Sequence, residues 1–292
     1  MSEKRLVIID SNALLHRAFH ALPPLTNKNG EPTGAVYGFL LTLFKAIKDL
    51  KATHIVATFD MPKPTFRHEK FKEYKAHRIK TPDGIVSQIP MMKEVLKSFD
   101  IPVFEQEGYE ADDLIATIAQ KSKNEANVFI LSGDLDNLQL VDEKIKVYTL
   151  GKGIKDSVLY DSQKVVERFG VTPEQMNDFK ALTGDTSDNI PGVPGIGKTT
   201  AAQLIQDYGS IKNIYDELAT DTAVLKPKVK EALKSNKENA FLSLELVQTK
   251  KDVDLDFDLE TCKFGSFNKE KVKVIFNELG FTSLIERLSN LI

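Results

Sequence analysis

Three short apolar runs, each followed by aspartate, constrain the fold of this chain more than any other feature. They are LVII at 6–9 before Asp10, HIVATF at 54–59 before Asp60, and VFIL at 128–131 before Asp134 and Asp136. Runs that are apolar on both faces are typical of buried parallel strands. Because parallel strands end at one edge, where open α/β folds place their sites, we expect these four acids to converge in one crevice. For any single position, the role of a turn residue or helix N-cap stays open.

Helical patterns alternate with these runs. Apolar residues recur at helical spacing over 35–50 and over 112–123. This alternation predicts an α/β fold with a doubly wound, mainly parallel sheet, to which we assign residues 1–161.

Near Ser162 the pattern changes to short helices broken by glycine and proline. Helices are predicted near 162–169, 173–183, 198–208, 211–218 and 228–235, which makes residues 162–250 a small all-α subdomain. The remainder, 251–292, begins with strict alternation of Asp and apolar residues over 252–259 and ends in a helix over 269–279. The alternation indicates an extended segment with an acidic face. An EF-hand is not favoured, because the loop glycine and closing glutamate are missing. We expect this last part to pack back on the first domain.

Composition excludes several classes of protein. The single cysteine, Cys262, allows neither an intramolecular disulfide nor a thiolate metal cluster, which favours a reducing compartment. The apolar run at the N-terminus is too short for a signal peptide, and no stretch approaches the length of a membrane span. We therefore expect a cytoplasmic protein without a membrane partner.

Five further acids lie in two compact motifs: Glu110, Asp112 and Asp113 in YEADDL, and Asp185 and Asp188 in TGDTSD. Carboxylates gathered at one edge repel one another and raise one another's pKa, and divalent cations relieve this. Oxygen ligands without cysteine or clustered histidine favour Mg²⁺ or Mn²⁺ over zinc. Two such ions close together are a common apparatus for phosphodiester hydrolysis.

The net charge of −3 does not by itself indicate a nucleic-acid binder. When the nine candidate metal-binding carboxylates are left out of the sum, the net charge of the remaining residues is +6. The strongest basic stretch, 63–80, carries a net charge of +5. If it is helical, it aligns rings with cations in one stripe: Arg67, Phe71, Tyr74, Lys75 and Arg78. Such a stripe suits single-stranded nucleic acid, although an ordinary solvated helix with two buried rings stays open.

The stretch GVPGIGKT at 192–199 spells the nucleotide-binding pattern G-x-x-x-x-G-K-T. That pattern has its meaning only between a buried strand and a helix, and the preceding TSDNIP is polar and ends in proline. We therefore predict a tight hairpin between two helices, and no ATP site.

These motifs together resemble the 5′ nuclease family, which includes the 5′→3′ exonuclease region of bacterial DNA polymerase I, its stand-alone relatives and the flap endonucleases. The matching stretches are LVIIDSNALLHRAFHAL, AVYGF, FD at 59–60, FRHEKFKEYKAHR, GYEADDLIAT, SGDLDNLQLV and ALTGDTSDNIPGVPGIGKTTA. The resemblance covers essentially the whole chain. It departs at Leu135, where most relatives carry Lys or Arg.

The resemblance implies a resolvase-like sheet domain, a helical arch at about 63–80 and a helix-hairpin-helix subdomain. It implies that two or three divalent ions are bound by Asp10, Asp60, Glu110, Asp112, Asp113, Asp134, Asp136, Asp185 and Asp188. It assigns catalytic roles to Lys75 and Arg78, which hold the scissile phosphate, and to Arg17, which makes a further phosphate contact. It assigns DNA binding to Arg67, Tyr74, Gly192, Gly195, Gly197, Lys198 and Thr199, with K⁺ at the hairpin.

The sequence thus predicts a Mg²⁺-dependent (or Mn²⁺-dependent) 5′→3′ exonuclease and 5′ flap endonuclease of replication and repair. Its expected partners are DNA with a 5′ flap or 5′ end and RNA–DNA primer junctions. The chain is expected to be monomeric and functionally linked to a DNA polymerase. A non-catalytic DNA-binding module and a PIN-type ribonuclease remain alternatives; the latter would be shorter and lack the arch and the hairpin.

Overall fold

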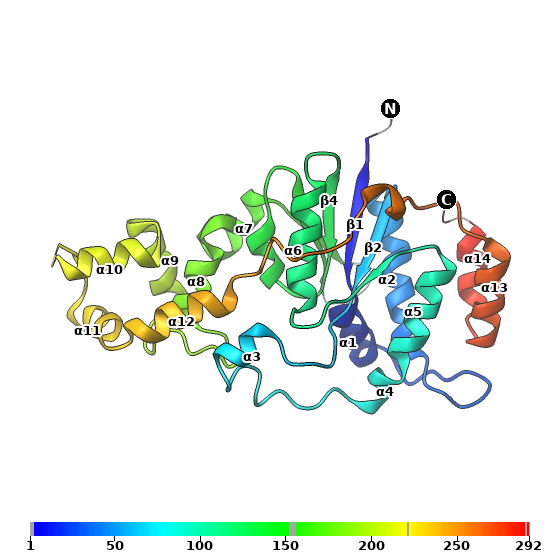
Figure 1. The fold of residues 1–292 in the computed structure, drawn as a ribbon, viewed down its shortest axis with the longest axis horizontal. Helices are drawn as coiled ribbons and strands as arrows, with labels where there is room; N and C mark the ends of the chain where they lie inside the picture. The colour runs from blue at the N-terminus through cyan, green and yellow to red at the C-terminus, as the bar shows by residue number, and fades with distance from the viewer. Residues whose placement is uncertain (1–2, 152–155, 221, 290, 292) are drawn as a thin grey trace.

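The computed structural model describes residues 3–151, 156–220, 222–289 and 291 (Figure 1). Its centre is a six-stranded sheet with the order β3-β2-β1-β4-β5-β6, in which only β5 and β6 pair antiparallel. The strands are β1 (Arg5–Asp10), β2 (His54–Thr58), β3 (Val103–Phe104), β4 (Asn127–Leu131), β5 (Ile145–Leu150) and β6 (Ser157–Tyr160). The three predicted runs are therefore neighbouring parallel strands at the centre, as expected.

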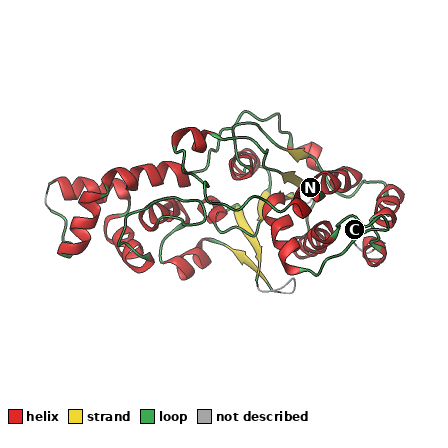
Figure 2. Ribbon diagram, turned by 90° about the horizontal axis from the view of Figure 1, so that it is seen from below, coloured by secondary structure: helices red, strands yellow, loops and turns green. Residues whose placement is uncertain are grey.

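Both faces of the sheet are covered, because side chains of the central strands alternate between two cores. In β1, Leu6 and Ile8 point into one cluster while Val7 and Ile9 point into the other. α6 (Ala111–Ser122) covers the first face. The second face is covered by α1 (Ser11–Ala21), α2 (Gly34–Leu50), α5 (Gln88–Ser98), α13 (Lys269–Glu278) and α14 (Thr282–Ser289). Figure 2 shows the strands between these helices. No helix in the described ranges is long and apolar enough to cross a membrane.

A helical unit follows the sheet and extends to one side of it (Figure 1). Its α-helices are α7 (Ser162–Phe169), α8 (Met176–Thr183), α9 (Lys198–Tyr208), α10 (Ile211–Ala219), α11 (Pro227–Ser235) and α12 (Lys237–Val247), with a 3₁₀ turn at Pro173–Gln175. The predicted helices are confirmed, while α12 was not predicted because its apolar residues are spread around the helix.

The acidic segment 252–259 runs extended along the sheet domain. Its four aspartates are exposed, whereas Val253, Leu255 and Leu259 are buried, so the alternation predicted from the sequence is confirmed. The C-terminal helices then pack on the second face, where Phe276 lies beside Phe44 and Phe99.

The basic stretch 63–80 is not one helix, and here the sequence-based expectation was wrong. Only α3 (Phe66–Lys70) is helical; turns follow, and the next short helix is α4 (Asp83–Val86). Lys75 adopts a left-handed backbone conformation with φ of 54°. Its backbone N–H donates to the carbonyl of Asp188, 2.9 Å away, and Asn189 donates to the carbonyl of Glu73. The backbone of this stretch is thus hydrogen-bonded to the loop 184–190 of the helical unit. These hydrogen bonds use backbone groups that a continuous helix would need for its own i to i+4 bonds.

Arg67 lies inside the protein and holds α3 to α6. Its guanidinium forms two parallel hydrogen bonds of 2.8 Å to the carboxylate of Asp113 and donates further to the carbonyls of Leu246 and Gln248. Arg67 is 2% exposed and Asp113 is fully buried. Sheet domain, basic stretch and helical unit therefore meet at one buried ion pair.

Removing one partner of this pair leaves the other charge buried and unpaired, so we expect Arg67→Met or Asp113→Asn to lower the free energy of unfolding by about 3–5 kcal/mol. Arg67→Lys should recover only part of this, because an ammonium cannot form the two parallel bonds. Urea unfolding measures the change. Lys70→Met is the control, because Lys70 pairs with Glu245 at an exposed site and such pairs contribute less than about 1 kcal/mol. Equal losses in Arg67→Met and Lys70→Met would contradict the structural role.

Candidate active site

The carboxyl ends of β1, β2 and β4 carry the core of the acidic cluster. Asp10 accepts hydrogen bonds from Ser132 Oγ at 2.6 Å and from the backbone N–H of Ala13 at 3.1 Å, so it also caps α1. Asp60 accepts from the backbone N–H of Ala111, 2.7 Å away, at the start of α6. The N-cap role weighed for single aspartates is therefore real for Asp10, and it coexists with membership of the cluster.

The next acids are placed by the turn after β4. Asp134 Oδ1 accepts from the backbone N–H of Asp136 at 2.9 Å. Asn137 donates to Asp112 Oδ1 at 3.2 Å, which joins this turn to the first turn of α6. The turn after the central strand β4 is thus linked to the start of α6 by short polar side chains.

Burial and mutual repulsion dominate the electrostatics of the cluster. Burial raises the pKa of Asp10 to about 7, and repulsion by Asp60 and Asp134 adds to the rise. Burial raises the pKa of Asp136 to about 7 as well, with repulsion by Asp134. The pKa of Asp112 is raised well above its ordinary value by burial and then by Asp10. Perturbed carboxylates gathered in this way mark a functional site.

Two basic residues of the stretch 63–80 reach the acids at the junction with the helical unit. Lys75 Nζ lies 2.6 Å from Glu110 Oε1 and 3.8 Å from Asp188 Oδ2. Arg78, whose side chain is half exposed, bonds the other oxygen of Asp188. The structure therefore places both predicted phosphate contacts, Lys75 and Arg78, beside the cluster.

Tyr74 and Arg67 do not form the predicted surface for nucleic acid. The ring of Tyr74 is 3% exposed, and its hydroxyl oxygen lies 3.0 Å from Glu110 Oε2 and 3.2 Å from Asp188 Oδ2, so that its one proton is shared between the two carboxylates. This ring is not available for stacking on a base, so Tyr74 positions two acids instead. Arg67 is buried against Asp113.

Both oxygens of Asp113 are taken by Arg67 and by backbone N–H groups of Glu110 and Lys250, so we withdraw Asp113 from the candidate ligands.

A lysine that sequence reasoning missed lies on the other side of the junction. Lys180 Nζ, on α8, bonds the carboxylate of Asp136 and lies 2.9 Å from Asp185 Oδ2. Burial alone lowers the pKa of Lys180, but the two carboxylates outweigh this and raise it; in return, Lys180 lowers the pKa of Asp185 to about 2. The signal in the sequence was a lone cation in the apolar helix that leads into TGDTSD.

Arg17 lies apart from these pairs. Its guanidinium donates to the carbonyl of Gly151, and its side chain runs beside Gly133. No contact between Arg17 and the acids is found in the described part of the chain, so its role at a phosphate stays a prediction.

Residues 184–197 connect α8 to α9, and the glycine-rich part at 192–197 forms the predicted turn before α9. Gly184 and Gly192 approach so closely that a Cβ at Gly192 would lie 2.3 Å from the backbone nitrogen of Gly184, and both glycines have positive φ. α9 begins at Lys198 with Gly197 as N-cap and no side-chain cap. Lys198 and Thr199 are exposed there. Since a loop rather than a strand precedes this stretch, the nucleotide-binding reading is not supported.

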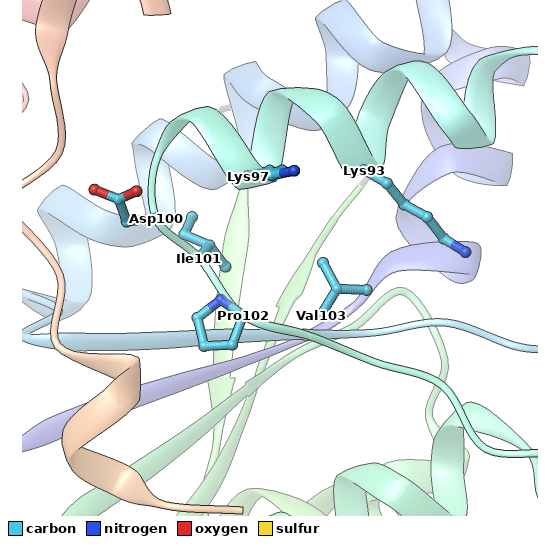
Figure 3. A pocket seen from close by; sticks show the side chains of 6 residues that line it. All are labelled: Lys93, Lys97, Asp100, Ile101, Pro102 and Val103. Atoms are coloured by element: carbon cyan, nitrogen blue, oxygen red, sulfur yellow. The ribbon is translucent and has the colours of Figure 1, made fainter. Parts of the chain in front are cut away.

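One pocket lies away from the acids, between α5 and the segment that leads into the edge strand β3 (Figure 3). Its volume is about 520 Å³, and it is lined by Lys93, Lys97, Asp100, Ile101, Pro102 and Val103. Lys93 is paired with Glu105 and lies over the ring of Phe59. None of the predicted site residues lines it, so it is not the candidate active site.

In the described ranges, no group of three or more acid, His or Cys side chains is arranged around a single ion. The acids at the junction are bridged by lysines, while Asp10, Asp60, Asp112 and Asp134 form no ion pair within those ranges. The donor set is oxygen throughout, which suits hard divalent cations, and the side chains must shift to surround one.

The comparisons with known proteins agree with this arrangement. The profile of the 5′-3′ exonuclease N-terminal resolvase-like domain matches residues 5–170, and that of the 5′-3′ exonuclease C-terminal SAM fold matches 171–270. DNA polymerase I of Bacillus subtilis is 43% identical over 286 residues, which are 98% of this chain and 32% of that protein. The chain thus spans about a third of the length of such relatives.

Among solved structures, a complex of the bacteriophage T5 flap endonuclease with DNA and metal ions has a TM-score of 0.68 at 23% identity, with 98% of this chain and 100% of that chain covered. The catalytic core of Rad2 in complex with DNA substrate has a TM-score of 0.66 at 20% identity, with coverage of 100% and 93%. These two likenesses show the fold, and the profile matches show the family. The chain therefore belongs to the 5′-3′ exonuclease family and is a nuclease, a hydrolase of phosphodiester bonds.

Proposed function

We propose that this nuclease is Mg²⁺-dependent and cuts 5′ flaps, 5′ ends and RNA primers in DNA replication and repair. The observation that carries the proposal is the convergence of eight carboxylates where the carboxyl edge of the sheet meets the loop 184–190, with Lys75 and Arg78 beside Glu110 and Asp188. A protein that only bound DNA would not gather buried anions where a phosphate must lie. The T5 relative described above was solved with DNA and metal ions, which supports the same use of this cluster.

A buried acceptor in the cluster also supports a bound cation. Asn137 is 1% exposed, and its Oδ1 has no hydrogen-bond partner, while its amide group donates to Asp112. Buried oxygens without a donor call for water or an ion. Asp10, Asp60, Asp112 and Asp134 would hold the ions nearest to the sheet, with Glu110, Asp136, Asp185 and Asp188 completing the set.

Divalent ions held by these acids would supply an activated water and neutralise the charge that develops on the phosphate. The side chains of the protein position the phosphate and the acids. To bind oxygens of the scissile phosphate, Lys75 would release part of its contact with Glu110 and Arg78 part of its contact with Asp188, because ammonium and guanidinium groups form charge-assisted hydrogen bonds with phosphate as well as with carboxylate. Tyr74 fixes Glu110 and Asp188 by its hydroxyl. The exposed amides at the start of α9 hold the duplex backbone, with K⁺ as an expected companion.

Several finer parts of the proposal follow from the relatives. The DNA polymerase I proteins are bacterial, and we infer a role in the bacterial cytoplasm next to a DNA polymerase activity. The chain is proposed to act as a monomer on a flap or 5′ end, without ATP.

The first prediction tests the cluster. Asp134→Asn or Asp60→Asn should reduce cleavage of a labelled 5′-flap duplex by more than about a thousandfold, because one lost anion displaces the ions that stabilise the transition state. Binding of the same DNA should stay similar or tighten, since repulsion of phosphate falls. Quench-flow cleavage with Mg²⁺ and with EDTA, together with anisotropy titrations, gives both quantities. Near-native turnover of either variant at saturating Mg²⁺ would refute the assignment, and so would cleavage in EDTA.

The second prediction separates the cations beside the acids from the hairpin. Lys75→Ala and Arg78→Ala should lower the single-turnover rate at least about tenfold more than they weaken duplex binding, since they act at the scissile phosphate. Lys198→Ala should weaken binding modestly and reduce the slope of log affinity against log salt by about 1. Binding at two salt concentrations and single-turnover rates are the measurements. The reverse pattern would place the duplex on the stretch 63–80 instead.

The third prediction concerns pH. Asp10 has a pKa of about 7 in the fold against an ordinary value of 3.8, so the folded state holds the extra proton between these limits. The metal-free protein should therefore lose stability as pH rises from about 4 to about 7. Asp185, whose pKa is lowered to about 2, has the opposite effect on stability, but this effect is confined to pH values below about 4 and does not overlap with that of Asp10. Melting temperatures in EDTA and in Mg²⁺ measure the effect.

Two comparisons control this prediction. In Asp10→Asn the fall with rising pH should be smaller than in the wild type, because one proton-binding group is gone. Saturating Mg²⁺ should remove most of the fall in the wild type, because the ion stabilises the ionised carboxylates. An identical slope in Asp10→Asn and wild type would show that Asp10 does not retain its proton in the fold.

A further inference from the structure

Two pairs of acids cross the junction between the sheet domain and the helical unit, and a lysine bridges each pair. Glu110 and Asp188 are bridged by Lys75. Asp136 and Asp185 are bridged by Lys180, with one bond to each carboxylate. In each pair, one acid belongs to the sheet domain and the other to the loop 184–190, so the same arrangement is built twice.

An ammonium between two carboxylates occupies the position that a divalent ion would take when the same carboxylates bind it. The side chain of Lys180 is 17% exposed, comes from the regular helix α8, and has both of its carboxylates within hydrogen-bond reach. It therefore neutralises a repulsive pair that no other cation contacts in the described ranges. The absence of a ready three-ligand group in those ranges agrees with acids that are held by lysines.

We propose that Lys180 is a stand-in cation that a divalent ion displaces from Asp136 and Asp185, and that the released ammonium then binds a DNA phosphate. This inference rests on the proposed metal dependence and adds a role that the acids alone do not imply. It makes metal binding and DNA binding mutually favourable: the ion expels a cation from the acids, and that cation raises the affinity of the same surface for an anion.

The exchange predicts opposite effects of one substitution on two ligands. In Lys180→Met, Mn²⁺ has no cation to displace, so calorimetric titration of the whole 292-residue chain should show about tenfold tighter Mn²⁺ binding than in the wild type. The rise of the melting temperature on adding Mn²⁺ should be larger for the same reason. In wild type, Ca²⁺ should increase the affinity for a 5′-flap duplex over that in EDTA, and in Lys180→Met this increase should be at least about threefold smaller.

Two variants control the experiment. Lys212→Met removes the same charge from an exposed position on α10, and it should leave both the Mn²⁺ affinity and the effect of Ca²⁺ on DNA binding unchanged. Lys180→Arg keeps the charge and should stay near the wild-type Mn²⁺ affinity. Lys180→Gln provides a second neutral variant if the methionine variant does not fold.

The outcomes are separable from those of the proposed function. If the neutral variants bind Mn²⁺ no more tightly than the wild type, the stand-in role is overturned and Lys180 is a structural ion-pair partner only. If they bind Mn²⁺ more tightly but Ca²⁺ promotes DNA binding as in the wild type, the release of the ammonium to phosphate is overturned. If the wild type and Asp134→Asn bind Mn²⁺ equally and neither cleaves, the proposed metal-dependent function itself fails.

Discussion

Repulsion among carboxylates at one edge of a parallel sheet is the constraint on which the rest of this structure depends. Parallel strands bring Asp10, Asp60 and the turn after β4 together whether or not their charges are compatible. The chain answers this in two ways. The innermost acids are held protonated by burial to higher pH, as for Asp10, and the outer acids are neutralised by lysines. Both kinds of neutralisation are reversible, as the proposed binding of divalent cations requires.

The sequence was most informative where a local pattern decides the structure. The three central strands, the acids after them and most helices of the second half followed from periodicity and from strand ends. The stretch 63–80 was misjudged, because its helical spacing is real but its backbone donors and acceptors are taken by the loop 184–190. Periodicity reports which residues share a helix face only after a helix has formed.

In the candidate site, too, the residues placed by local pattern were predicted, and those placed by tertiary contacts were not. The acids that follow β1, β2 and β4 lie at the sheet edge where strand order placed them, whereas Lys75 and Arg78 reach Glu110 and Asp188 from turns and not from the expected helix. Arg67, Tyr74 and Asp113 have the expected residue types but are turned inward to hold elements together. Whether an arginine faces solvent or a buried carboxylate is decided by tertiary packing of α3 on α6, which no spacing in the chain records. Lys180 was missed for the same reason, since its partners come from two different domains.

The contact between Gly184 and Gly192 has a mechanical consequence. With less space than one methyl group between the two backbones, the turn that ends α8 and the turn that precedes α9 cannot slide past each other. The turn at Gly184 leads into Asp185 and Asp188, and the turn at Gly192 leads to the first residues of α9. The close packing of these two glycines therefore holds the acidic loop and the start of α9 at a fixed separation.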